Sequence, residues 1–394
     1  MLNYHFTEKL LGLEDAIVKN LQLVQNTFII DVIMEQRIHT CPSCSFQTSK
    51  VHDYHTQLVK HTPSSGFPVL LRLKKRRHVC PVCGKRFFEN VPFLPKYQRT
   101  TNALWGYILA ELSHAVSMKE IAQKVQLSQA TIGRIIDHVQ YTCKKLPRAL
   151  SIDEFRGNSG GEKFQCILTD PKAKQVIDIL PTKKAEDIYQ YFASFPDRKQ
   201  VRFVVMDLST FFRSIAKNCF PKAEIVADKF HALRLAIYAL EQVRKEEQKK
   251  FAEKRRKYFK RSRTLLIKHK EKLHKEELEA VSQMLSLSKP LAQAYYLKEL
   301  AYTFFASKSL SEAKKNLLAF HMAAQAAAIP SFEKVSETYR EWEQELLNIF
   351  KSGLSNGFTE GCNNKIKVLK RISYGMPNFT RFRTRILHQM QTND

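Results

Sequence analysis

The sequence lacks any apolar run close to the roughly 18 residues that a membrane-spanning helix requires. Its start, MLNYHFTEKLLGLEDAIVKN, also lacks the basic stretch followed by an apolar stretch that marks a secretory signal. We therefore expect a cytoplasmic protein without a membrane partner. Disorder of the whole chain is excluded too, because 44% of the residues are hydrophobic and 26 are Phe, which is ample for packed cores.

Acidic residues are also in short supply. The chain holds 38 Asp and Glu against 64 Lys and Arg, and the resulting net charge of +26 predicts a polyanionic partner. At roughly 100–200 residues per domain, the chain has room for about two to four domains.

Periodicity and composition divide the chain into five parts. Residues 1–95 are rich in loop signals and hold four of the eight Cys, and residues 96–148 have helical periodicity with little Gly or Pro. Residues 149–235 contain short β-rich runs such as RFVVMD, separated by turns or a helical stretch, which predicts an α/β core. Residues 236–350 have helical periodicity with dense charge, and residues 351–394 form a Gly-bounded helix with a basic end.

Two C-x2-C pairs, Cys41-Pro-Ser-Cys44 and Cys80-Pro-Val-Cys83, each offer two thiolates from one tight turn. Together they predict a closed, structural Zn²⁺ site with four thiolate ligands and a hairpin-like excursion between the pairs. Fortuitous core Cys or a redox dithiol are the alternatives. A nearby His could replace one Cys, but four Cys suffice, so we expect these to be surface or core residues: His39, His52, His55, His61 and His78.

The segment from Ser117 to Ile136 has the pattern of a helix-turn-helix. Its apolar residues would pack two short helices together, and Ser128 is a suitable N-cap for the second. Gln129, Thr131 and Arg134 would then face outward near the start of that helix, where a recognition helix contacts base edges. An ordinary helical hairpin is the alternative, which the Cys pairs and the net charge disfavour.

Basic clusters elsewhere are candidates for contacts with DNA phosphates. From Glu241 to Lys275 the chain holds 15 Lys and Arg against 5 Glu, an excess that favours phosphate contact over a merely solvated helix face. Candidate residues precede the second Cys pair or lie in this helical segment: Lys74, Lys75, Arg76 and Arg77, and Lys254, Arg255 and Arg256.

Three acids in separate segments could serve one metal site. Asp153 ends the run ALSID and Asp207 ends the longer run VRFVVMD, and acids at the carboxyl ends of buried strands meet at one edge of a sheet. Glu360 lies in SNGFTEGCNNKIK, where Asn364 and Lys367 share its helix face. Converging, the acids would bind two Mg²⁺ (or Mn²⁺) ions for phosphoryl transfer. Taken singly, they have plain alternatives: a strand-end turn, a helix N-cap and a solvated helix residue.

The blocks IDEF, VVMDLS, ADKFH and SNGFTEGCNNKIKVLKR closely resemble those of the ISL-three family of bacterial insertion-sequence transposases. The order of Cys pairs and helix-turn-helix matches that family as well. The resemblance implies an RNase H-like α/β catalytic core, interrupted by a large all-helical insertion, with a DDE triad at Asp153, Asp207 and Glu360. The implied parts are a zinc-binding module (1–95), a helix-turn-helix DNA-binding domain (96–148), the first part of the core (149–235), the insertion (236–350) and the last core helix with a basic tail (351–394).

Asp228 and His231, in the block ADKFH, are possible neighbours of this active site. The resemblance implies that His231 contacts DNA or orients a phosphate, and capping of the first turn of a helix is the alternative. Asp228 could compete with Asp207 as the second metal ligand. We prefer Asp207 because its block matches the second Asp of the family.

The sequence therefore predicts a DNA transposase that binds the terminal inverted repeats of its element, cleaves each end and joins it to target DNA. Its partners would be double-stranded DNA and, because two ends are paired, a second copy of the chain in a homodimer. In a bacterial cytoplasm such a protein would be nucleoid-associated when bound to DNA. A DNA-binding regulator with a vestigial catalytic domain and a plain Mg-dependent nuclease are the alternatives.

Overall fold

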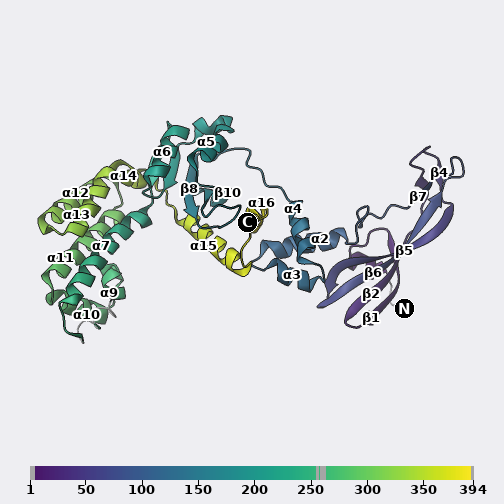
Figure 1. Cartoon of the computed structure of the whole chain (residues 1–394), viewed down its shortest axis with the longest axis horizontal. Coiled ribbons are helices and arrows are strands. Elements are labelled where there is room, and N and C mark those ends of the chain that lie inside the picture. The colour runs from purple at the N-terminus through teal and green to yellow at the C-terminus, as the bar shows by residue number, and fades with distance from the viewer. Residues whose placement is uncertain (1–4, 254–256, 258–262, 392–394) are drawn as a thin grey trace. The chain divides into compact units, whose positions relative to one another are not determined.

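The computed structural model describes residues 5–253, 257 and 263–391 (Figure 1). They form two compact units: a terminal unit, Met1–Tyr141 with Val368–Asp394, and a central unit, Thr142–Lys367. No helix in the described part of the chain is both long and apolar enough to cross a membrane.

A five-stranded sheet begins the terminal unit, where the sequence predicts mainly loops. β2 and β6 are parallel and the other neighbours antiparallel, and one face packs a core that includes Ile30, Leu71 and Leu73. The long strands β5 and β6 form the predicted excursion between the Cys pairs. The elements of this part are α1 (His5–Leu10), β1 (Ala16–Val24), β2 (Thr27–Met34), β3 (His39–Thr40), β4 (Gln47–Thr48), β5 (Val51–Ser64), β6 (Phe67–Val79) and β7 (Arg86–Phe88).

The helix-turn-helix predicted after this sheet is present. Ser117 and Ser128 cap its two short helices, each accepting a hydrogen bond from a backbone N–H three residues later. A preceding helix shares their apolar core, which buries Leu104, Ile121 and Ile132. The three helices are α2 (Asn102–Ser113), α3 (Met118–Lys124) and α4 (Gln129–Asp137).

The C-terminal helix α16 (Phe379–Gln391) packs against α2 and α4 and thereby belongs to the helix-turn-helix domain. Arg385, which is almost fully buried, donates hydrogen bonds to the carbonyls of His114 at 3.0 Å and Val116 at 2.7 Å. The compact units thus group α16 with the helix-turn-helix, whereas the sequence-based division placed residues 351–394 together. The cause is tertiary: its buried face fits the turn between α2 and α3.

The central unit is built on a second five-stranded sheet, with the strand order β10-β9-β8-β11-β12. β10, β9 and β8 are antiparallel neighbours, whereas β8, β11 and β12 are parallel. Three strands come first, followed in turn by a helix, a strand, a second helix and the last strand. They are β8 (Ala149–Phe155), β9 (Gln165–Asp170), β10 (Gln175–Leu180), α5 (Ala185–Ala193), the 3-10 helix η1 (Pro196–Gln200), β11 (Phe203–Met206), α6 (Thr210–Cys219) and β12 (Glu224–Ala227).

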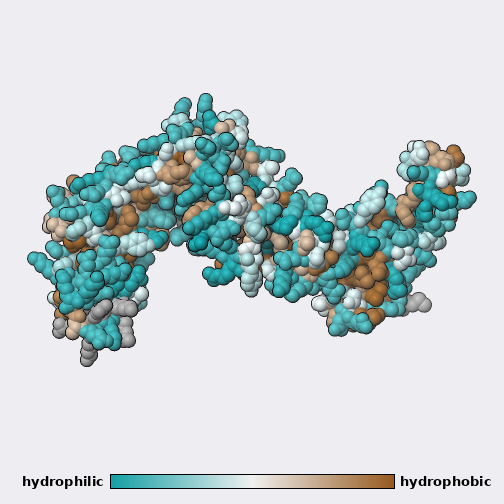
Figure 2. Space-filling view, viewed as in Figure 1, coloured by the Kyte–Doolittle hydropathy of each residue, from teal (hydrophilic) through white to brown (hydrophobic). Residues whose placement is uncertain are grey.

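Among the described residues, all elements after β12 are helices. Hydrophilic side chains cover most of the face seen in Figure 2. Within these helices, the hydroxyl of Tyr339 donates a hydrogen bond of 2.8 Å to the carbonyl of Ala232. The side chain of Asn348 donates a hydrogen bond of 2.8 Å to the carbonyl of Ile225 in β12. The predicted phosphate contacts Lys254, Arg255 and Arg256 lie outside the described residues. The helices are α7 (Lys229–Lys249), α9 (Arg263–Ile267), η2 (Lys270–Lys272), α10 (Lys275–Ser286), α11 (Lys289–Ala306), α12 (Leu310–Ala327), α13 (Pro330–Glu341), α14 (Glu343–Ser352) and α15 (Gly357–Ile372).

Candidate active site and nucleic-acid interface

Three Asp residues lie side by side at the carboxyl ends of three parallel strands. Extending the pairing of β11 with β12 by one residue places Asp207 opposite Asp228. Extending the pairing of β11 with β8 by two residues places it opposite Asp153. The backbone N–H of Asp228 extends the ladder by donating to the carbonyl of Met206 at 2.7 Å. Because neighbouring strands are about 4.8 Å apart, the three carboxyl groups share one edge of the sheet. Asp153 and Asp207 therefore lie at the same edge of the sheet.

Burial governs the ionisation of these acids. Asp153 is only 7% exposed, and its burial, with a contribution from the charge of Asp207, raises its pKa to about 6. Burial also raises the pKa of Asp207, against the opposing charge of His231. The carboxylate of Asp153 accepts hydrogen bonds from the N–H of Glu154 at 2.8 Å and from Nδ2 of Asn363 at 2.9 Å. Oδ1 of Asp207 is buried and has no hydrogen-bond partner among the described residues, which suits a bound cation.

Asp228 is engaged differently, because both of its oxygens have partners. One accepts a hydrogen bond from the N–H of Phe230 at 3.1 Å and so caps α7, and the other bonds Nδ1 of His231. The hydrogen bond to Asp228 raises the pKa of His231, and the charges of Asp153 and Asp207 act in the same direction. The imidazole of His231 therefore lies next to the two acids, and its positively charged form is favoured there. The free oxygen of Asp207 favours Asp207 over Asp228 as a metal ligand.

Helix α15 lies along β8 and is held there by a row of polar side chains (Figure 1). Asn356, just before the helix, accepts a hydrogen bond from the hydroxyl of Ser151. Thr359 bonds the same hydroxyl at 3.0 Å, and Asn363 donates to Asp153 at 2.9 Å. These residues are spaced at helical intervals, so one face of α15 is fixed against the strand that carries Asp153.

Glu360 lies on this docked face of α15. It follows Asn356 by four residues and precedes Asn363 by three, and it is half-buried. Its carboxylate is not in a tight cluster with the two Asp carboxylates, because the ligand atoms of Asp153, Asp207 and Glu360 do not all lie within 4.8 Å of one another. The structure thus brings Asp153 and Asp207 together and places Glu360 on the helix beside them.

Asn363, rather than the predicted Asn364, is the amide that contacts the acids. Asn364 and Lys367 are exposed, and Nζ of Lys367 donates to Oδ1 of Asn364 at 3.3 Å. The face fixed by Asn356 and Thr359 turns Asn363 inward, toward Asp153. The polar residues at positions 356, 359 and 363 were the signal in the sequence that could have identified it.

The four Cys of the two pairs form a compact group. Sγ of Cys41 lies 3.5 Å from Sγ of Cys83, Cys44 and Cys80 are separated by the same distance, and all four Sγ atoms lie within 4.8 Å of one another. Tetrahedral Zn²⁺ with bonds of about 2.3 Å sets its sulfur ligands about 3.8 Å apart. Gly84, at φ +69°, closes the second turn with a hydrogen bond to the carbonyl of Cys80. The group fits the predicted four-thiolate zinc site.

Helix α4 presents the side chains expected to contact bases. Gln129 and Arg134 are exposed, and Thr131 is half-buried. The N–H of Thr131 donates to Oγ of Ser128 at 3.2 Å, and Arg134 donates to the hydroxyl of Thr131 at 3.1 Å. This is the position from which a recognition helix contacts a DNA groove.

The basic cluster of β6 is only partly available to a ligand. Lys74 is exposed, and Lys75 and Arg77 are half-buried. Arg76 shares a face of the strand with Lys74, but the chain after β7 covers that face, and Arg76 forms a buried ion pair with Glu89 at 3.0 Å. The prediction that Arg76 contacts phosphate is therefore wrong.

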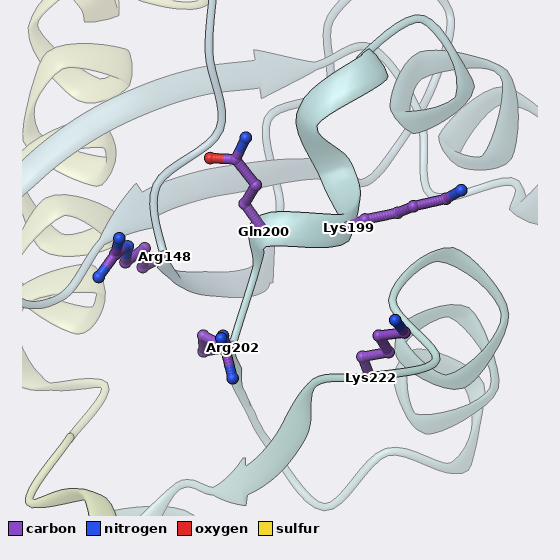
Figure 3. A pocket seen from close by; sticks show the side chains of 5 residues that line it. All are labelled: Arg148, Lys199, Gln200, Arg202 and Lys222. Carbon is purple, nitrogen blue, oxygen red and sulfur yellow. The ribbon is translucent and has the colours of Figure 1, made fainter.

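A basic hollow of about 370 Å³ lies at the amino ends of the parallel strands (Figure 3). Two of its cations directly precede β8 and β11, and another lies just before β12. The sequence does not reveal this group because its members come from distant segments. Such a gathering of cations fits the phosphates of a nucleic acid. Its lining residues are Arg148, Lys199, Gln200, Arg202 and Lys222.

Comparisons with known proteins match three consecutive parts of the chain. Residues 37–83 match the zinc finger of the transposases of IS204, IS1001, IS1096 and IS1165, residues 89–140 match the helix-turn-helix domain of transposase family ISL3, and residues 150–386 match the DDE-type transposase model of that family. The order of the three domains is the predicted one.

Two curated transposases are similar over most of their length. The transposase of insertion sequence element IS1001 from Bordetella parapertussis is 24% identical over 349 residues, which cover 86% of each chain. The transposase of IS1557 from Mycobacterium tuberculosis is 22% identical over 338 residues, covering 78% of this chain and 75% of its own. Since the DDE-type model also spans more than half of this chain, the protein belongs to the ISL3 (ISL-three) family of insertion-sequence transposases.

Proposed function

We propose that the central unit is an RNase H-like catalytic core with an all-helical insertion, and that Asp153, Asp207 and Glu360 form its DDE triad. One observation carries this proposal: the strand register sets Asp153 and Asp207 side by side, and the helix bearing Glu360 is hydrogen-bonded to Asp153. The mixed sheet and the helical block between β12 and α15 support the core and its insertion.

Two divalent ions, Mg²⁺ or Mn²⁺, would be held by these three carboxylates. Hard oxygen ligands suit such ions. The unpartnered oxygen of Asp207 and the raised pKa of Asp153 support the assignment, because a cation would satisfy the first and favour ionisation of the second. When bound, the ions would lower the pKa of the attacking oxygen and offset the charge on the leaving oxygen.

The chain's own residues would position the reacting DNA. His231, hydrogen-bonded to Asp228, would contact a phosphate at the site, and Asn363 would hold the carboxylate of Asp153 in place. In the first reaction, water attacks the phosphorus at an element end and the 3′-oxygen leaves as a hydroxyl. In the second, that hydroxyl attacks a target phosphodiester and displaces a 3′-oxygen of the target.

DNA would be bound at several surfaces of the chain. Gln129 and Arg134 of α4 would contact bases of the terminal inverted repeats, supported by Thr131. Phosphate contacts would come from Lys74, Lys75 and Arg77 on β6 and from the basic hollow of the central unit. Pairing of two ends would require a homodimer in the DNA complex, and transposition would follow a cut-and-paste route.

Strand-cleavage and strand-transfer assays on end DNA with Mg²⁺ test the triad. Asp153→Asn, Asp207→Asn and Glu360→Gln should each abolish cleavage and joining while leaving end binding intact. Glu186→Gln, at an exposed acid of α5, is the matched control and should keep both reactions. Residual cleavage in a triad variant would refute the assignment.

The same assays separate the alternatives. A regulator with a vestigial catalytic domain would bind ends without cleaving them, and a plain nuclease would cleave without joining. Intact acids at the sheet edge and a docked α15 favour the transposase over the regulator.

A further inference from the structure

A second group of side chains that are able to bind metal lies beside the four Cys of the four-thiolate zinc site. The pattern His-x-Cys-Pro-x-Cys occurs twice, with His39 two residues before Cys41 and His78 two residues before Cys80. Side chains two residues apart in an extended chain project to the same side, so each His lies next to a zinc ligand. The two imidazole rings lie together, with centroids 4.5 Å apart.

Glu89 completes this group. It follows β7, and its side chain is fully buried. Ligand atoms of His39, His78 and Glu89 all lie within 4.8 Å of one another. Arg76 holds the carboxylate of Glu89 in place through its backbone N–H at 2.6 Å and its guanidinium at 3.0 Å, one contact to each oxygen. Each oxygen keeps a second lone pair for a further partner.

The imidazole nitrogens of this group lack hydrogen-bond partners among the described residues. Nε2 of His39 and both ring nitrogens of His78 are buried and unpaired. Such atoms are rare in folded proteins, because an unsatisfied buried polar group costs about 1–3 kcal/mol. A shared cation would satisfy one nitrogen of each ring and a lone pair of Glu89.

We propose that His39, His78 and Glu89 bind a second divalent transition-metal ion, Zn²⁺, next to the four-thiolate site. Two imidazoles and one carboxylate are a known donor set for zinc and leave a fourth position open to water. The ion would join β3 to β6 and to the residue after β7. These His residues, expected from the sequence to be surface or core residues, would then be ligands. The proposal is independent of the catalytic assignment in the central unit.

The zinc content of the full-length protein tests this proposal. The protein is loaded with excess Zn²⁺, desalted and analysed by inductively coupled plasma mass spectrometry. Wild type should hold two ions per chain. His78→Phe, which keeps an aromatic ring against His39 but removes both nitrogens, should hold one. His55→Asn, at an exposed His of β5, is the control and should hold two. Equal zinc contents in the wild type and His78→Phe would overturn the proposal.

Cobalt substitution gives a readout on the wild type that does not depend on the folding of a variant. Metal-free protein is titrated with Co²⁺, and thiolate-to-cobalt charge transfer reports the four-Cys site. This absorption should saturate at one equivalent, while d–d absorption from a site without sulfur ligands should grow through a second equivalent. If all absorption stops at one equivalent, the second site does not exist.

Discussion

The side-chain amide of Asn363 offers a sharp test of the candidate active site. It donates a hydrogen bond of 2.9 Å to Oδ2 of Asp153, in a place where both residues are buried. Asn363→Ala removes this donor without adding bulk or charge. A donor stabilises the ionised carboxylate more than the protonated form, so its loss should raise the pKa of Asp153.

The size of the effect follows from the strength of such a bond. A hydrogen bond to a charged group contributes about 1.5–3 kcal/mol and a pKa unit corresponds to about 1.4 kcal/mol, so the pKa should rise by about one to two units. Starting from about 6 in the wild type, Asp153 would then titrate at about 7–8. At neutral pH the ionised fraction would fall from about nine-tenths to between a half and a tenth.

The assay is the rate of Mg-dependent end cleavage as a function of pH, at a metal concentration below half-saturation. Binding of the metal requires the ionised acid, so the acid limb of the profile should move up by about one to two units in Asn363→Ala. Asn364→Ala is the matched control, because Asn364 is exposed and contacts Lys367 instead. Coincident acid limbs for Asn363→Ala and wild type, with both proteins folded by circular dichroism, would show that Asn363 does not control the pKa of Asp153.

Four further predictions test other parts of the chain. Burial raises the pKa of Asp153 from 3.8 to about 6. The contribution of Asp153 to the free energy of unfolding is therefore fully present below pH 4 and is lost as the pH rises to 6. Asp153→Asn should stabilise the metal-free protein by on the order of 3 kcal/mol at pH 8, but not at pH 4, in thermal melts. Arg385→Ala removes the side chain that donates hydrogen bonds to two backbone carbonyls. It should lower the free energy of unfolding of the terminal unit by about 2–4 kcal/mol, measured by denaturant unfolding. Replacing Arg148 and Arg202 together by Gln should reduce the salt slope of DNA binding, measured by fluorescence anisotropy, by about 1.8 if each contacts one phosphate. Cys41→Ser should remove zinc from the four-thiolate site, and retention of that ion would contradict the ligand assignment.

The parts of the site that the sequence predicted are those set by local patterns. A buried β-branched run that ends in an acid identified Asp153 and Asp207, because such a run forms a central strand whose end lies at the sheet edge. The Cys pairs and the Ser-capped helices are equally local signals. Each depends on residues within a few positions of one another, so no knowledge of the distant chain was required.

The parts that escaped prediction depend on contacts between distant residues. Whether Asn363 or Asn364 turns toward Asp153 depends on the rotation of α15, which is fixed by Ser151, about two hundred residues away. Arg76 is basic and lies in a basic run, yet Glu89 covers it. The placement of α16 against the helix-turn-helix likewise rests on contacts with helices more than 240 residues earlier.

The parallel strands of the central unit explain how a strongly basic protein keeps a site for cations. Parallel strands gather all their carboxyl ends on one edge of the sheet and all their amino ends on the other. The acids Asp153, Asp207 and Asp228 occupy the first edge, and Arg148 and Arg202 begin at the second. Asp207 follows Arg202 by five positions of extended strand along β11, a distance of about 16 Å, which exceeds the screening length at physiological salt of about 8 Å. Antiparallel strands would instead have brought acids and cations to the same edge, where ion pairs would have consumed both. The topology therefore leaves the acids free for metal ions and the cations free for phosphates, as the proposed reaction on DNA requires.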